Sequence, residues 1–234
     1  MFRPKLPDIE KFKPDDGRIK VLVTGCGRSG TQYMTKALRT MGLRVGHERF
    51  REDGIVSWYL AEDSRVKLFK DIIGKNPICY IHLVRHPLKV INSMYKIILN
   101  PNRTGLNIFT QKYPEQCQGL KHPAAIVTKW WIFWNDLVSK NYPRASLIKI
   151  EDLQKPAYIN LIANAIDSQK NRQELIPKIL NLDTKMHTMD AYQKKLMLRR
   201  YGKDFQKTIT MQDIESFGLD DNLKRTALKY GYKL

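Results

Sequence analysis

Residues 19–31 have the sequence IKVLVTGCGRSGT, and this stretch decides the fold. Its first part, 19–24, is a run of apolar and β-branched residues, which is typical of a buried strand. Glycines follow at positions 25, 27 and 30, and a helical pattern covers 31–41. A buried strand that passes through glycines into a helix is the first unit of an alternating chain, so the stretch predicts an α/β fold.

Further strands and helices alternate along the chain. Helical patterns cover 88–99, which opens at Pro87, and 122–140. The alternation predicts a three-layer α/β architecture, in which a mostly parallel sheet has helices on both faces. Residues 100–119, rich in Asn, Gly, Pro and Gln, predict a long loop. Runs of β-forming residues predict four more buried strands, the first weaker than the others: 43–46, 66–69, 78–84 and 145–150.

The length of 234 residues fits a single domain, with an α/β core over 19–153 and a mainly helical tail over 154–234. Hydrophobic residues make up 42% of the chain, which excludes wholesale disorder. We expect no membrane span, because no apolar stretch approaches the ~20 residues that crossing requires. The first residues lack the apolar core of a secretory signal, so we expect a cytoplasmic protein. Three cysteines without CxxC spacing suggest neither a disulfide framework nor a zinc site.

The charge balance indicates an anionic partner. Lys and Arg number 41 against 23 Asp and Glu, which gives a net charge of +18. Residues 65–112 alone hold nine Lys or Arg and one acidic residue, Asp71. Nucleic acid, a membrane surface, an acidic polymer and a phosphorylated cofactor all fit this sign, and composition does not choose among them.

The turn after the first strand has the residues of a phosphate-binding loop. Its sequence TGCGRSGT leaves backbone N–H groups unpaired beside the positive end of the following helix. The spacing is close to the P-loop pattern GxxxxGK[ST], with Gly25 and Gly30 in place. Thr31, however, stands where the lysine belongs, and Arg28 supplies the cation. The simpler alternative is a tight turn whose glycines serve only the backbone. In either case we expect the helix N-terminus to lower the pKa of Cys26.

A second candidate site follows the predicted strand at 78–84. Arg85 comes directly after this strand, and the helix that begins at Pro87 carries Ser93. In doubly wound sheets, ligands bind outside the carboxyl ends of the strands. Arg85 is therefore placed where a guanidinium can bind a second phosphate.

These stretches together resemble the cofactor motifs of sulfotransferases. GCGRSGTQYM, residues 25–34, resembles their 5′-phosphosulfate loop. RHPLKVINS, residues 85–93, resembles their 3′-phosphate motif, in which an Arg precedes a Ser by eight positions. IKIEDL, residues 148–153, is similar to the segment usually written YEDL, with Ile150 in place of the tyrosine. The resemblance spans 21–153 and implies a P-loop NTPase-like fold, with 3′-phosphoadenosine 5′-phosphosulfate (PAPS) as the sulfuryl donor and no metal.

The resemblance also implies roles for individual residues. Arg85 and Ser93 would bind the 3′-phosphate. Tyr33 stands where many members carry an aromatic residue that stacks on the adenine, and a core residue in the first helical turn is the alternative. The 5′-phosphosulfate would lie against Gly27, Arg28, Ser29, Gly30, Thr31 and Gln32.

Transfer to a hydroxyl needs a general base near the acceptor. Glu48 is the first candidate, because a Glu at a similar offset after the loop is the base in tyrosylprotein sulfotransferases and some others. His47 is the second, since its unperturbed pKa suits the task and a His serves as base in other branches. Adjacent side chains on an extended segment point opposite ways, so we expect only one of the two to face the acceptor. A surface His–Glu pair in a turn is the alternative.

The sequence therefore predicts a soluble sulfotransferase that moves a sulfuryl group from PAPS to a hydroxyl or amine, in line with the leaving phosphate. The acceptor stays open among small molecules, carbohydrates and other hydroxyl compounds, acidic ones included. A P-loop nucleotide kinase is the first alternative, which the missing lysine disfavours. A basic nucleic-acid-binding protein is the second, although no signature of one is present. A catalytically inactive binding module with the same fold is the third.

Overall fold

The computed structural model describes residues 19–61, 79–98, 105–182, 195, 199, 202 and 207–234, with the side chains of 105–108 left out. The strand predicted at 66–69 lies outside these residues. Contacts divide the chain into two compact units that are interleaved in sequence. The first comprises Met1–Arg85 and Asn135–Met186, and the second His86–Trp134 and His187–Leu234. Each unit combines segments from both sides of residue 153, and the single domain expected from the sequence stays a prediction.

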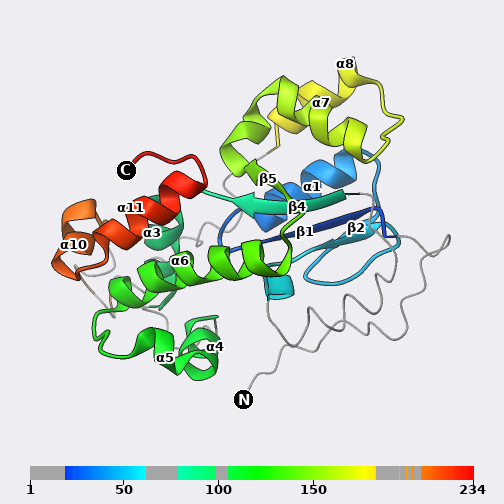
Figure 1. Cartoon of the computed structure of the whole chain (residues 1–234). Helices are drawn as coiled ribbons and strands as arrows, with labels where there is room; N and C mark the ends of the chain where they lie inside the picture. Colours follow the sequence, from blue (N-terminus) through cyan, green and yellow to red (C-terminus); the bar gives the residue numbers. More distant parts are fainter. Residues whose placement is uncertain are drawn as a thin grey trace. The chain divides into compact units, whose positions relative to one another are not determined.

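The first unit contains a five-stranded sheet in the order β2-β3-β1-β4-β5 (Figure 1). Every neighbouring pair is parallel, which confirms the predicted α/β class and the parallel sheet. Strand β3 has no counterpart among the predicted strands. The prediction that the last strand is buried is wrong in part, because it is an edge strand in which Leu147 is 42% exposed. The strands are β1 (Val21–Gly25), β2 (Val45–His47), β3 (Gly54–Val56), β4 (Cys79–Val84) and β5 (Ser146–Lys149).

Helices of the first unit pack on both faces of this sheet. Alternate residues of β1 and β4, such as Val23 and Leu83, share one hydrophobic core with three helices. The residues between them face the other way: His82 Nε2 lies 3.1 Å from Asn135 Oδ1 of α6 (Pro123–Asn141). Each fully buried Val or Leu contributes roughly 1.5–3 kcal/mol, so this two-sided burial explains why these strands are apolar runs. The helices of the first face are α1 (Thr31–Thr40), α7 (Pro156–Ala165) and α8 (Arg172–Leu180).

The connection from β2 to β3 is unusually short for parallel neighbours, which normally need a crossover of a dozen or more residues. Only residues 48–53 separate the two strands. Asp53 closes the connection, because its carboxylate accepts a 2.6 Å hydrogen bond from Arg44 N and lies 2.8 Å from Lys20 Nζ. The backbone passes so close to itself that a Cβ on Gly46 would lie 1.8 Å from Arg49 O. This turn (residues 48–53) therefore depends on a glycine and on one buried carboxylate.

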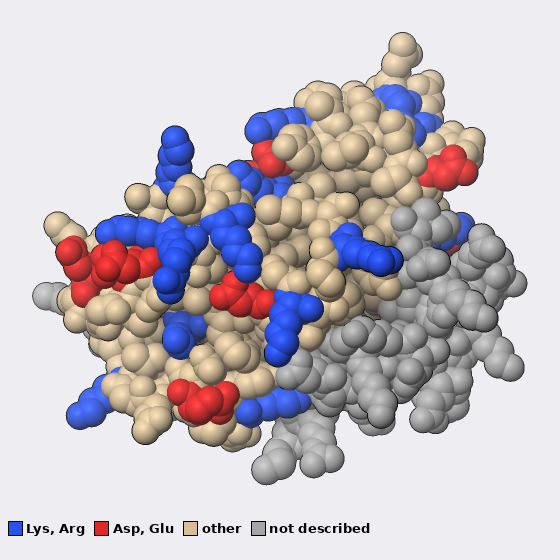
Figure 2. Space-filling view, viewed as in Figure 1, with Lys and Arg blue, Asp and Glu red and all other residues tan. Residues whose placement is uncertain are grey.

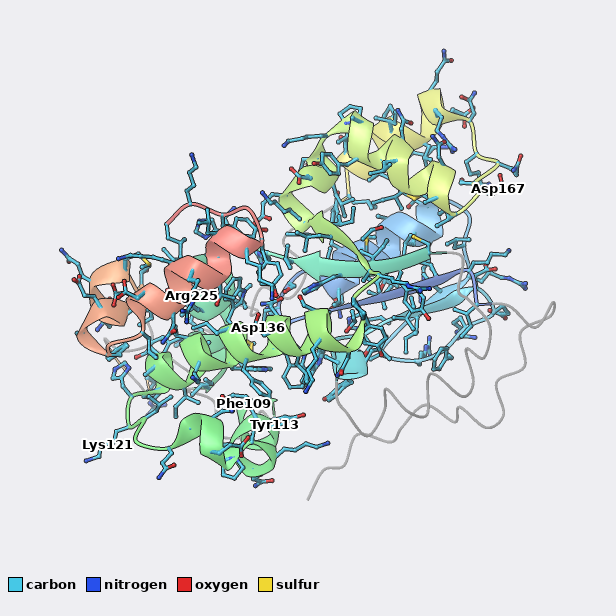
Figure 3. All side chains as sticks on the ribbon, in the orientation of Figure 1. Phe109, Tyr113, Lys121, Asp136, Asp167 and Arg225 are labelled. Atoms are coloured by element: carbon cyan, nitrogen blue, oxygen red, sulfur yellow. The ribbon has the colours of Figure 1, made fainter. Side chains whose placement is uncertain are left out.

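The second unit is helical in its described residues, and its core is aromatic. Phe109 is fully buried, with ring centroids 6.0 Å from Trp130 and 5.9 Å from Tyr113 (Figure 3). The prediction of a long loop over 100–119 is wrong for 105–117, which forms helices. Burial of Phe109 stabilises these helices, and the modest helix propensity of the Asn and Gln residues is not enough to prevent them. The helices are α3 (Pro87–Ile98), α4 (Gly105–Lys112), α5 (Pro114–Cys117), the first part of α6, α10 (Met211–Ser216) and α11 (Asp220–Lys229).

Charged side chains of both signs share the molecular surface. On the face in Figure 2, Lys and Arg side chains of the described residues are interspersed with Asp and Glu. Five of the nine cations between 65 and 112 lie outside the described residues. Among the described helices, none combines the length and the apolar character that crossing a membrane requires.

Candidate functional site

The turn between β1 and α1 (residues 25–30, here the glycine loop) has a left-handed backbone at two positions. Gly30, the N-cap of α1, has φ 93°, and Arg28 has φ 71°. The turn is closed by a hydrogen bond of 3.1 Å from Ser29 N to Cys26 O. The first turn of α1 carries no acidic residue, so the partial positive charge of the helix N-terminus is not offset there. This geometry suits the binding of a phosphate-sized anion.

Two hydroxyl groups at the glycine loop are fully buried. Thr24 and Ser29 are fully buried, and neither Thr24 Oγ1 nor Ser29 Oγ has a hydrogen-bond partner among the described residues. Leaving a buried hydroxyl unsatisfied costs about 1–3 kcal/mol. A ligand oxygen that reached Ser29 would remove this cost. The same burial raises the pKa of the Cys26 thiol, so the expected lowering is wrong: desolvation outweighs the helix N-terminus.

Arg85 is joined to the glycine loop by a hydrogen bond. It follows β4, the neighbour of β1, and its Nη1 donates to Arg28 O at 3.1 Å. A guanidinium carries five N–H donors in a planar fork, so this contact leaves other donors that can bind a phosphate. Ser93, its expected partner, lies half-buried on α3 in the second unit. The structure thus brings Arg85 to the loop, and it describes the two predicted 3′-phosphate ligands in different units.

The third sequence stretch, 148–153, also reaches the glycine loop. A Cβ added at Gly30 would lie 2.7 Å from Cγ1 of Ile150, the first residue of the 3₁₀ helix η3 (Ile150–Gln154). Lys149, one residue earlier, is paired in register with Val84. Lys149 is thus the last residue of β5, at the same edge of the sheet where Arg85 follows β4. This cation was not predicted from the sequence. Its position at a strand end is the signal that could have found it.

Tyr33 is a core residue. It is only 5% exposed, and its hydroxyl donates to Ile179 O at 3.1 Å and accepts from Gln154 Nε2 at 2.8 Å. Burial raises the pKa of Tyr33, and the hydrogen bond from Gln154 offsets part of this rise. The ring has no face available for an adenine, so the structure favours the core alternative over the stacking role. Gly27 is buried, and Gln32 is half-buried in the first turn of α1.

The two candidate bases converge instead of pointing apart. His47 Nε2 lies 3.9 Å from Glu48 Oε1, so the expectation that they face opposite ways is wrong. The reason is the left-handed backbone of Glu48, with φ 55°, which ends the extended segment at His47. His47 Nε2 also shares a 3.0 Å hydrogen bond with the Thr31 hydroxyl. Both candidates therefore lie beside the first residue of α1.

The pKa of the Glu48 carboxyl is raised above its value in water. Partial withdrawal from solvent raises the pKa of its carboxyl, and a hydrogen bond from the Trp58 side chain lowers it by less. The Glu48 side chain is still 39% exposed, which leaves it accessible to an acceptor. A carboxylate with a raised pKa is a stronger base than an ordinary one, so Glu48 is suited to proton abstraction near neutral pH.

Within the part of the chain that is described, no group of three His, Cys, Asp or Glu side chains is arranged to hold a metal ion. The candidate site consists of the glycine loop, whose geometry suits an anion, an arginine bonded to that loop, and a His–Glu pair beside it. When compared with known proteins, the chain matches no family model, no curated protein and no solved structure.

Proposed function

We propose that the protein is a PAPS-dependent sulfotransferase that transfers a sulfuryl group to a hydroxyl or amine acceptor. The motif resemblance motivates the proposal, and one contact carries it: the 3.0 Å hydrogen bond between Thr31 and His47. Through this contact the candidate bases lie at the loop that would hold the phosphosulfate. A phosphate-binding loop alone would serve many proteins, whereas a base beside it supports group transfer to a protic acceptor.

The proposed roles of the loop residues come from the motif resemblance, and the geometry of the loop supports them. Backbone N–H groups of 27, 28 and 30–32, the Thr31 hydroxyl and Arg28 bind the phosphosulfate end. Ser29 N is bonded to Cys26 O, but the buried Ser29 hydroxyl gains the partner that it lacks within the described residues. Arg85 binds the 3′-phosphate while its Nη1 holds the Arg28 carbonyl. When bound, PAPS supplies the activated sulfuryl group. The positive end of α1 and Arg28 stabilise the negative charge that develops on the leaving phosphate.

Glu48 is the proposed general base. His47 Nε2 is engaged with Thr31, whereas the Glu48 carboxylate is partly exposed. Glu48 takes the proton of the acceptor hydroxyl as the new oxygen–sulfur bond forms and the bond between sulfur and the 5′-phosphate oxygen breaks. The proton ends on Glu48 and the electron pair on the leaving phosphate. His47 orients Thr31 in this scheme.

The experiment is a transfer assay combined with nucleotide binding. Purified protein should bind adenosine 3′,5′-bisphosphate and should release it from PAPS when a suitable acceptor is present. Glu48→Ala should keep nucleotide affinity and lose about 10²–10⁴-fold in turnover. Normal turnover of Glu48→Ala, with loss in His47→Ala, would make His47 the base. If neither nucleotide binds at micromolar concentrations, the proposal fails, and Mg²⁺-dependent ATP binding would favour a kinase.

A further inference from the structure

Trp58 contacts Glu48 from the segment that follows β3. A side-chain hydrogen bond joins the two residues. The indole N–H is the only donor in a tryptophan side chain, so it donates to the Glu48 carboxylate. The backbone repeats this link, because Glu48 N donates to Val56 O at 3.0 Å. Glu48 is thus held to the segment 56–58 by both its main chain and its side chain.

The element that carries Trp58 is itself fixed on both sides. Trp58 begins the 3₁₀ helix η2 (Trp58–Ala61). Just before it, Ser57 N donates to Val23 O of β1 at 2.9 Å. At its other end, Leu60 O accepts a hydrogen bond of 2.7 Å from Tyr142 Oη, and Ala61 O accepts one of 2.9 Å from Asn141 Nδ2. The indole donor is therefore presented from a rigid position.

The ring of Tyr59 restricts the indole further. The ring centroids of Trp58 and Tyr59 are 3.8 Å apart at an interplanar angle of 31°, so the two side chains pack together. Glu48, in contrast, is a long side chain that is 39% exposed on a backbone with φ 55°. Such a side chain has several rotamers available in water, and selecting one of them costs conformational entropy. A fixed donor selects one of them.

We propose that Trp58 is a positioning residue for Glu48: its indole N–H fixes the direction of the Glu48 carboxylate beside His47. The catalytic part of this inference rests on the proposed function. The hydrogen bond favours the ionised carboxylate, which is the form that accepts a proton. Trp58 thereby opposes the desolvation that would otherwise keep more of Glu48 protonated.

The test removes the donor and keeps the ring. Trp58→Phe is compared with Tyr59→Phe, which deletes one polar group from the other ring of the pair. The pH titration of the Glu48 carboxyl carbon is followed by NMR and assigned by its disappearance in Glu48→Gln. We expect the Glu48 midpoint to move to higher pH in Trp58→Phe and to stay unchanged in Tyr59→Phe.

Enzyme kinetics give the second readout. In Trp58→Phe, kcat at pH 7 should fall about tenfold, which is less than the full rate contribution of a general base. The acidic limb of the pH–rate profile should move to higher pH. The KM for PAPS should not change. An unmoved Glu48 midpoint overturns the inference. If the Glu48 midpoint moves but neither the wild type nor any variant transfers a sulfuryl group, the contact between Trp58 and Glu48 is supported and the proposed function is wrong.

A measurement on the wild-type protein guards against a variant that does not fold. One of the four indole N–H signals should shift with the same midpoint as the Glu48 carboxyl carbon. This pH dependence should vanish in Glu48→Gln. If all four indole signals stay constant through the titration of Glu48, the inference is overturned without any substitution at Trp58.

Discussion

The glycine loop and the 48–53 turn follow two strands of one parallel sheet, β1 and β2, but they differ in how side chains support them. Each contains a non-glycine residue in the left-handed region, Arg28 with φ 71° and Glu48 with φ 55°. In the glycine loop the main chain supplies the contacts, with Ser29 N bonded to Cys26 O. The 48–53 turn has main-chain hydrogen bonds as well, such as that from Arg51 N to Gly54 O at 3.1 Å, and adds a buried carboxylate of its own, that of Asp53.

The difference separates binding from chemistry. The glycine loop offers backbone N–H groups, which no side-chain substitution removes. The 48–53 turn and its flanks offer the His47 and Glu48 side chains, which can be exchanged one at a time. Substitutions that displace the backbone of the glycine loop should therefore disrupt the fold as well. Substitutions of side chains in the 48–53 turn and its flanks should have more selective effects.

The largest expected effect is at Gly25. A Cβ there would lie 2.0 Å from Leu83 O, a backbone atom of the central strand β4 that cannot move without breaking sheet pairs. Gly25→Ala should lower the free energy of unfolding by about 3 kcal/mol or more, measured by urea denaturation. Gly119→Ala is the control, because no atom lies within 4 Å of that Cβ although φ is +78°. A loss in Gly25→Ala no larger than that in Gly119→Ala, which carries only the cost of its positive φ, would mean that the close approach to β4 is relieved at little cost.

The next effect is on binding and comes from Arg85, which joins the glycine loop to β4. Arg85→Ala should weaken binding of adenosine 3′,5′-bisphosphate about 10–100-fold, because charge-assisted contacts to phosphate are among the stronger hydrogen bonds. Calorimetric titration measures the Kd. Arg144→Ala, at an exposed position before β5, should change it little. A similar loss in both variants would indicate attraction by net charge alone.

Asp53 tests the side-chain support of the 48–53 turn. Burial raises the pKa of its carboxyl, but the contacts from Lys20 and Arg44 outweigh this, so the pKa is lowered overall. Asp53→Asn should cost about 1–3 kcal/mol of stability at pH 7. A lowered pKa means that this stability is present above the unfolded pKa of about 3.9 and is lost as pH falls through the folded value. Urea unfolding from pH 7 down to pH 3 should show the gap to wild type closing, and a constant gap would contradict the assignment.

The smallest effect is a gain of stability at Glu48. Because its folded pKa is raised, the protonated form favours folding, and this contribution is lost as pH rises through the folded value. Glu48→Gln has no charge to desolvate, so at neutral pH it should unfold at a slightly higher temperature than the wild type. Thermal midpoints should converge below the unfolded pKa of about 4.3. A variant less stable than wild type at pH 7 would show that the carboxylate is satisfied where it lies.

Sequence patterns predicted the glycine loop, its flanking strand and helix, and the position of Arg85 at a strand end, because each depends on neighbours in sequence. They did not predict β3, whose three residues pair only because Asp53 and Gly46 permit a short parallel connection. They also predicted a loop at 105–117, where Phe109 is buried in a helical core. Tyr33 could be assigned to the core only once its contacts with α8 and η3 were known.

By itself, the sequence determined the α/β alternation and the glycine-rich turn, since strand propensity, helical periodicity and glycine conformation are local properties. Only the tertiary structure decided that His47 bonds to Thr31 and that the Glu48 carboxylate turns toward His47. Their directions depend on a left-handed φ that is imposed by strand pairing and by Asp53, contacts between residues that are separated along the chain. No local pattern encodes such a φ for a glutamate, because outside this packing the residue would avoid that conformation.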